Sequence, residues 1–192
     1  MIFLLILPFI PFSSALAGSE PLNRTILNLQ SSNSAALVET LAQNPKEIFL
    51  RFQPALDSST KVLQPLLVSG SPSTPIIQLS LKKCVFFYCE AIDLDASISI
   101  AIQPPVCNKN YLMIVDLSRS SPRVREVYDG LDIQVCYQER PGGKGILQMD
   151  SFANQAKSFS PGIIQREIKK ILLMQVKPIV SAISKSLEDM EK

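Results

Sequence analysis

The strongest structural signal in the chain is a strict alternation of apolar and polar residues over residues 91–103, AIDLDASISIAIQ. Apolar side chains occupy every second position from Ile92 to Ile102, so an extended segment would have one dry face and one wet face. A helix does not separate residues in this way, because its side chains repeat every 3.6 residues. The pattern predicts a long antiparallel strand whose dry face is covered by a second layer.

Further strands are predicted on both sides of this run. Residues 76–81 alternate in the same way and lead into CVFFYC, which predicts a hairpin of two long strands. A separate strand is expected over residues 47–52. After the hairpin, strands over 111–117, 123–128, 131–138 and 146–152 continue an antiparallel meander, with a two-residue turn at Asp129-Gly130. Residues 54–75 contain four prolines and are expected to be a loop, with a short helix around 62–68.

Two regions have helical periodicity. In residues 19–43 apolar side chains recur every three to four positions, which predicts a helix broken near the polar patch 30–34, with Ser34 capping its second half. After Ser160-Pro161, a start signal, one apolar seam continues for about thirty residues, with a kink expected at Pro178. The predicted fold class is α+β, an antiparallel β-meander packed on a long C-terminal helix and an N-terminal helix.

The first seventeen residues predict a cleaved signal peptide. They form an apolar run that ends in Ala15-Leu16-Ala17, the small-x-small pattern of a cleavage site. Pro8 and Pro11 would interrupt a membrane-spanning helix, whereas the lack of Lys and Arg leaves an uncleaved anchor as the alternative. Cleavage after Ala17 would leave residues 18–192 as a single domain, secreted or periplasmic.

Four cysteines agree with an oxidising compartment, where three pairings are open. We favour Cys84 with Cys89 across a chain reversal, and Cys107 with Cys136 between a loop and a strand. A metal cluster is disfavoured because no C-x2-C pair is present and the chain contains no histidine. Asn23 begins an N-R-T sequon, a glycosylation site if the host is eukaryotic.

Composition excludes several classes of function. Nineteen basic and seventeen acidic residues give a net charge of +2, too balanced for a nucleic-acid binder. The absence of histidine removes His-dependent triads and His metal sites. Asp93 and Asp95 share a strand face and are interpreted as a solvated surface rather than a catalytic or Ca²⁺-binding pair. We expect no enzyme activity, no cofactor and no bound metal; the sequence does not indicate an oligomeric state.

The element order resembles a single tubular lipid-binding module of the bactericidal/permeability-increasing (TULIP) type. The resemblance covers most of residues 19–190 and rests on residues 76–81, the runs AIDLDASISIAIQ and LDIQVCYQ, and the helix IIQREIKKILLMQVKPIVSAI. In that superfamily a highly curved sheet wraps around a long helix, and the seam between them holds an acyl chain. The resemblance thus implies a curved sheet and a lipid-binding seam.

These observations together predict an exported, non-enzymatic protein that carries or senses a lipid or other hydrophobic ligand between sheet and helix. The expected ligand-binding side chains are Ile92, Leu94, Ile98, Ile100, Ile164, Ile168, Ile171, Leu172 and Ile179. The alternative is a structural or protein-interaction module of the cell envelope or extracellular space, which would use strand edges or the basic helix. Residues 161–185 carry five basic residues and one acidic residue, so peripheral contact of this helix with an anionic membrane is also expected beside its packing on the sheet.

Overall fold

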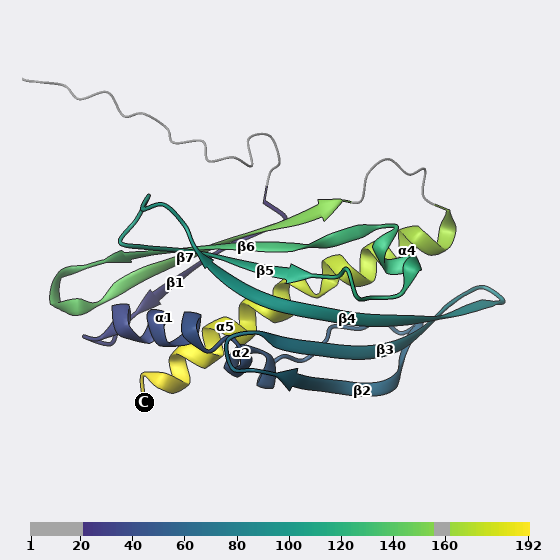
Figure 1. The fold of residues 1–192 in the computed structure, drawn as a ribbon, viewed down its shortest axis with the longest axis horizontal. Coiled ribbons are helices and arrows are strands. Elements are labelled where there is room, and N and C mark those ends of the chain that lie inside the picture. Colours follow the sequence, from purple (N-terminus) through teal and green to yellow (C-terminus); the bar gives the residue numbers. More distant parts are fainter. Residues whose placement is uncertain (1–20, 156–161) are drawn as a thin grey trace, which may run out of the picture.

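The computed structural model describes residues 21–155 and 162–192, in which a curved antiparallel sheet wraps around helices on its concave side (Figure 1). Seven strands lie in the order β1-β7-β6-β5-β4-β3-β2, with neighbours antiparallel. The strands are β1 (Asn23–Leu29), β2 (Thr60–Gly70), β3 (Pro75–Val85), β4 (Tyr88–Ile102), β5 (Lys109–Asp116), β6 (Tyr128–Glu139) and β7 (Gly145–Gln155). The helices are α1 (Ser34–Gln43), α2 (Lys46–Leu50), α3 (Pro122–Arg125), α4 (Ile163–Met174) and α5 (Val176–Met190), with a 3-10 turn at Pro141–Gly143. The fold class is α+β, as the sequence predicted.

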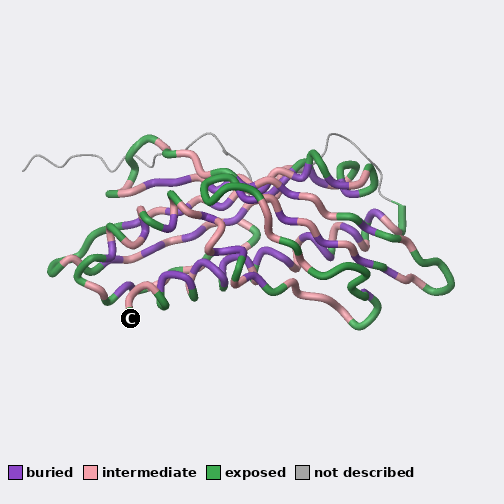
Figure 2. The backbone as a smooth tube through the Cα atoms, turned by 60° about the horizontal axis from the view of Figure 1, so that its bottom comes forward, coloured by how far each residue is buried: buried purple, intermediate pink, exposed green. Residues whose placement is uncertain are grey.

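Alternating side chains from neighbouring strands meet on the concave face. The register pairs Leu79 with Leu94, and the same alternation buries every second residue of β5 to β7 (Figure 2). The pattern predicted for β4 is correct from Ile92 to Ile100. Ile102, at the end of the strand, is 83% exposed; beyond Ser97, β4 pairs with β5 alone.

The C-terminal helical region follows the predicted seam and divides into α4 and α5 at Gln175. The break lies three residues before Pro178, where the kink was predicted. A proline ring lacks the N–H for a helical hydrogen bond and clashes with the carbonyl four residues earlier, here that of Met174. The Gln175 side chain stabilises the break, since it accepts from the Ala55 N–H at 3.0 Å and donates to the Ala55 carbonyl at 2.8 Å.

The N-terminal helix predicted over residues 19–43 is only half correct. Residues 34–43 form α1, but 23–29 form the edge strand β1, which pairs with β7 along its length. Leu27 and Leu29 point inward whereas Ile26 is 60% exposed, so the inward period is two. The cap of α1 is Asn33, and the Ser34 hydroxyl instead donates to the Ser31 carbonyl.

Three other sequence predictions are wrong. Residues 46–50 form α2 rather than a strand. Half of the loop expected over 54–75, with all of the short helix expected around 62–68, is the strand β2. Asp129-Gly130 is no turn, because β6 runs through it and residues 122–125 form α3. Gly130 serves close packing instead: a Cβ there would lie 2.5 Å from the Val115 carbonyl oxygen of β5.

The outer strand β2 is irregular. Its register against β3 shifts between Val62 and Gln64 and again between Gln64 and Leu67. Pro65, which has no N–H to donate, lies inside the second shift. Proline is tolerated here because β2 has a partner strand on one side only.

Two disulfides tie the sheet together, in the pairing favoured from the sequence. Cys84 and Cys89 face each other near the turn of the β3–β4 hairpin, and Cys107 joins Cys136 of β6. Such bonds persist in an oxidising environment. The predicted signal peptide and the Ser160-Pro161 start signal lie outside the described residues.

A buried lysine near the end of β3 connects this strand to α4. Lys83 is 3% exposed, and its Nζ lies 2.5 Å from Asp57 Oδ2 and 3.3 Å from Glu167 Oε2. It also donates to the Ser59 hydroxyl at 2.7 Å. A buried ammonium group requires such partners, because without them the lost hydration is not replaced. The Lys83 hydrogen bond holds the pKa of Asp57 well below its usual value, and hydrogen bonds from Lys170 and then Lys83 lower that of Glu167.

The Lys83 cluster predicts acid sensitivity. Both carboxyls have folded-state pKa values below the unfolded ones, so their stabilisation is present above about pH 5 and is lost as the pH falls through the folded-state values. Asp57→Asn should lower the free energy of unfolding at pH 7 by about 2 kcal/mol, less than for a fully buried pair because solvent reaches this carboxylate. Urea unfolding between pH 7 and pH 3 measures both effects. The control is Asp129→Asn at an exposed carboxylate; an equal loss in both variants would contradict the prediction.

Candidate functional site

The seam between the sheet and the helices is largely filled by the side chains of the protein. Ile92 and Ile98 of β4 are at most 1% exposed, and Ile168, Ile171 and Ile179 of the helices at most 3%. The sequence did not decide between a filled and an open seam. Among the described residues the structure shows a packed seam with two small apolar cavities on its concave side. A wider hollow of about 490 Å³ lies where α4 meets α5, bordered by Ala55, Leu173 and Met174 among others.

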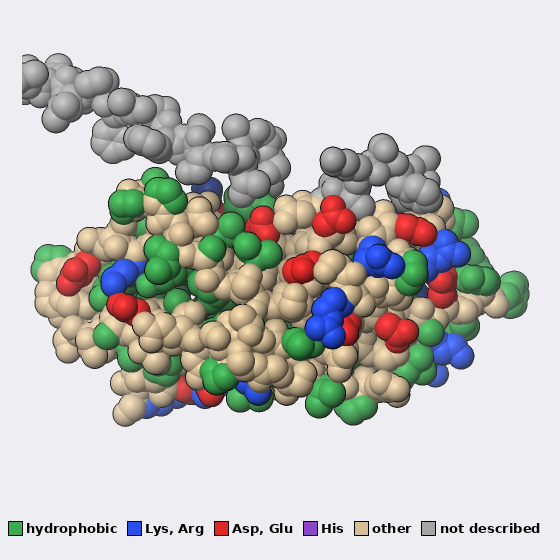
Figure 3. Space-filling view, in the orientation of Figure 1, with side chains coloured by type: hydrophobic (Ala, Val, Ile, Leu, Met, Phe, Trp, Pro, Cys, Tyr) green, Lys and Arg blue, Asp and Glu red, His purple; other side chains and the backbone are tan. Residues whose placement is uncertain are grey.

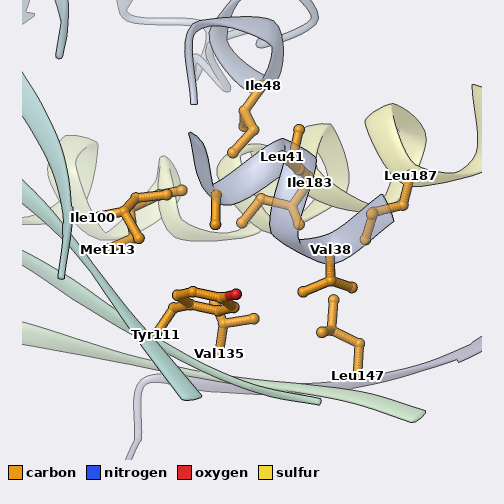
Figure 4. Close-up of a pocket in the computed structure, with 11 residues that line it drawn as sticks. Val38, Leu41, Ile48, Ile100, Tyr111, Met113, Val135, Leu147, Ile183 and Leu187 are labelled. Carbon is orange, nitrogen blue, oxygen red and sulfur yellow. The ribbon is translucent and has the colours of Figure 1, made fainter. Parts of the chain in front are cut away.

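The first cavity lies beneath α1, and we call it the α1 cavity. Its volume is about 30 Å³, and side chains from helices and strands point toward one another around it (Figure 4). The lining residues are Val38, Leu41, Ala42, Ile48, Ile100, Tyr111, Met113, Val135, Leu147, Ile183 and Leu187. Their side chains are hydrocarbon or thioether except for one hydroxyl, that of Tyr111.

The Tyr111 hydroxyl is the polar feature of the α1 cavity. Tyr111 is 8% exposed, and Figure 4 shows its oxygen directed among the apolar side chains that line the cavity. Within the described ranges 21–155 and 162–192 the hydroxyl makes no hydrogen bond, whereas the Tyr137 hydroxyl donates to the Lys144 carbonyl. Burial raises the pKa of Tyr111, so the group stays a neutral donor at physiological pH. The oxygen is not among the fully buried side-chain atoms that lack a partner, and the charges of Lys109 and Glu39 act on it, so the hydroxyl lies at an accessible border of the cavity. A hydroxyl in this position can bind the polar end of a molecule that enters the cavity.

The second cavity lies where α4 meets α5, and we call it the Gln175 cavity. It measures about 60 Å³ and is lined by Phe49, Phe52, Ile77, Leu79, Leu94, Ala96, Val115, Leu117, Leu131, Leu172, Gln175 and Ile179. Gln175 is the one polar side chain in this lining, and its amide is occupied by Ala55 and by the Ile171 carbonyl. The Gln175 cavity therefore offers apolar contact alone.

The nine residues expected to bind ligand separate into two groups. Four line a cavity: Ile100 at the α1 cavity, and Leu94, Leu172 and Ile179 at the Gln175 cavity. Five contribute to the packed seam and line neither cavity: Ile92, Ile98, Ile164, Ile168 and Ile171.

Sequence reasoning missed the part of the cavity lining that comes from α1 and α2. Val38 and Leu41 belong to a helix that was predicted but not placed against the sheet, and Ile48 was assigned to a strand. The helical spacing of Leu37, Val38 and Leu41 was the available signal. It indicates a buried helix face without saying which strands the face meets.

The two aspartates on the convex face of β4 have polar partners. Asp93 accepts from the Ser80 hydroxyl, and Asp95 accepts from the Gln78 amide and lies 3.4 Å from Arg119. They border a shallow hollow of about 280 Å³. In the part of the chain that the structure describes, no cluster of three metal-ligating side chains occurs, and no helix has the length and hydropathy of a membrane span.

Comparisons with known proteins identify a similar arrangement in solved structures only. No protein-family model matches the chain, and no curated protein matches its sequence. Similar solved structures are a START superfamily protein from Mycobacterium smegmatis (12% identity, TM-score 0.41, 88% of this chain and 97% of that chain), the Zhui aromatase/cyclase from Streptomyces sp. R1128 (8%, 0.43, 88% and 92%), and Ara h 8.0201 (12%, 0.42, 87% and 98%). These names differ from the tubular lipid-binding family that the sequence resembles, and similarity at this level assigns the chain to neither group.

The two tyrosines provide a test of the α1 cavity. Tyr111→Phe should leave the free energy of unfolding nearly unchanged, because the hydroxyl has no partner among the described residues and is not fully buried. Tyr137→Phe should lower it by about 1 kcal/mol, because that hydroxyl is bonded. Denaturant unfolding of both variants makes the comparison. An equal loss in the two variants would show that the Tyr111 hydroxyl is bonded in the folded protein.

Proposed function

We propose that the protein is a non-enzymatic binding protein for a small hydrophobic ligand with one polar end. The apolar body of the ligand lies between the concave face of the sheet and the helices, and the polar end accepts a hydrogen bond from Tyr111. A fatty acid or a comparable amphipathic molecule has this chemistry. The observation that carries the proposal is the position of the Tyr111 hydroxyl, the one polar side-chain group in the lining of the α1 cavity.

Ligand binding requires the α1 cavity to enlarge. A cavity of about 30 Å³ holds a water molecule, whereas ligand pockets measure roughly 300 to 1,000 Å³. The ligand therefore displaces side chains of the seam, and α1 is the element best suited to move. It has ten residues, no side-chain N-cap bond, and an exposed ion pair from Glu39 to Lys109 of β5 at 2.8 Å. An exposed pair of this kind contributes little stability.

Uptake of a dansyl-labelled undecanoic acid tests the proposal. The wild-type protein should bind the probe with enhanced, blue-shifted fluorescence, because the fluorophore and chain leave water. Tyr111→Phe should weaken binding about tenfold, since a hydrogen bond to a carboxylate is lost while the ring remains. Ala42→Leu, which places extra carbon atoms at the α1 cavity, should also weaken binding.

The matched control is Tyr128→Phe. Tyr128 is 1% exposed and lines neither cavity, so this variant should bind the probe like the wild type. If the wild-type protein does not bind the probe, the proposal is wrong. Equal affinity of the Tyr111→Phe and Tyr128→Phe variants for the probe would show that the Tyr111 hydroxyl does not contribute to binding.

The small cavity volumes favour one alternative, an interaction module of the cell envelope or extracellular space. A packed seam supports a rigid scaffold that needs no cargo. Cross-linking in the native compartment discriminates between the two functions. A carrier is recovered mainly without a partner chain, whereas an assembly component is recovered with a stoichiometric one.

The apolar stripe of the C-terminal helices packs on the sheet. Membrane contact through this region would involve the exposed basic face, which includes Lys170, Lys177 and Lys185. Contact through that face stays a prediction, as does glycosylation at Asn23, which lies in β1.

We also propose that the protein is exported and acts outside the cytoplasm, with two disulfides as the structural support. Intact mass spectrometry of the secreted product should find a chain that begins at Gly18. Ala17→Arg should leave the precursor uncleaved, because the peptidase pocket accepts small residues. A secreted wild-type chain that retains residues 1–17 would contradict the cleavage site.

A further inference from the structure

The β3–β4 hairpin ends in three exposed aromatic side chains. Phe86, Phe87 and Tyr88 are 93%, 105% and 55% exposed. Figure 1 shows the hairpin reaching beyond the rest of the sheet, and hydrophobic side chains form that end of the molecule in Figure 3. These three residues, the aromatic tip, contact little of the protein. Large exposed apolar groups that gather at one point mark a surface that binds something else.

A tight turn closed by a disulfide supports the aromatic tip. Val85 pairs with Tyr88, so Phe86 and Phe87 form a two-residue turn, and the disulfide between Cys84 and Cys89 closes the hairpin directly below. Phe86 has φ of +55°, in the left-handed region where glycine or asparagine is favoured. Its ring gains almost no contact within the molecule to offset that conformation. A strained and exposed aromatic residue indicates a binding role.

Basic side chains lie behind the aromatic tip. Lys82 of β3 is directly opposite Lys61 of β2, and both are exposed. Neither takes part in an ion pair with the residues that the structure describes, and their juxtaposition concentrates positive charge on the convex face. Figure 3 shows basic side chains on both sides of the base of this hairpin. Lys82 is four residues from Phe86, or about 13 Å along a strand.

We propose that the aromatic tip inserts into the interfacial region of an anionic lipid membrane, with Lys61 and Lys82 contacting the headgroups. Aromatic residues favour this region, where apolar side chains reach roughly 5 to 10 Å below the headgroups. The two lysines then lie at headgroup level, where basic residues are attracted to anionic lipids. A lipid surface accommodates a protruding tip of this kind without a shaped groove. This proposal is independent of ligand binding in the α1 cavity.

Co-sedimentation with vesicles tests the insertion. The full mature chain should bind vesicles of phosphatidylcholine with phosphatidylglycerol more strongly than vesicles of phosphatidylcholine alone, and added salt should weaken binding. Phe86→Ser with Phe87→Ser should reduce partitioning about tenfold or more, because two apolar side chains no longer enter the bilayer. Lys61→Gln with Lys82→Gln should abolish the preference for anionic vesicles.

The matched control is Ile102→Ser. Ile102 is 83% exposed at the opposite end of β4, so its loss removes a similar exposed apolar group and should leave vesicle binding unchanged. Circular dichroism confirms that each variant is folded. The proposal is overturned if the wild-type chain binds neither kind of vesicle, or if the double Phe variant binds as well as the wild type. The Phe86→Ser, Phe87→Ser variant should take up dansyl-undecanoic acid like the wild type. This measurement distinguishes a failure of membrane insertion from a failure of the proposed ligand site.

Discussion

The structure depends on covering one apolar surface, the concave face of the seven-stranded sheet. Alternation along each strand directs every second side chain to that face, and an antiparallel sheet without a second layer would leave them in water. α4 and α5 supply most of the cover, and the Lys83 cluster fixes α4 against β3. The proline-induced break at Gln175 divides this cover, and one of the two cavities lies beneath the division.

Much of the sheet was predictable from local pattern, whereas its two edges were not. β3, β4 and β7 have one dry face, and a period of two is visible without knowledge of their partners. β1 was assigned to a helix because its apolar residues fit both periods. β2 was assigned to a loop because the four prolines of residues 54–75 outweighed its apolar residues. The candidate site was half predictable. Leu94, Leu172 and Ile179 follow from amphipathic faces, but the unpaired Tyr111 hydroxyl depends on how α1 crosses the strands, which no local pattern contains.

The two proposed binding features lie far apart on the same strand. Tyr111 of β5 pairs with Ile102 at one end of β4. Tyr88 of the aromatic tip lies at the other end of β4, fourteen residues earlier. At about 3.4 Å per residue this is about 48 Å. Contacts made at the tip therefore leave the α1 cavity accessible from the opposite end of the molecule.

The shifted register of β2 affects how readily the protein aggregates at high concentration. A flat outer strand with exposed Val62, Leu63 and Leu67 would be a template on which further chains could stack into a fibril. Two bulges and a proline interrupt the row of free amide donors, so an incoming strand finds no continuous ladder. The irregular register thereby disfavours the addition of a further strand along the β2 edge of the sheet.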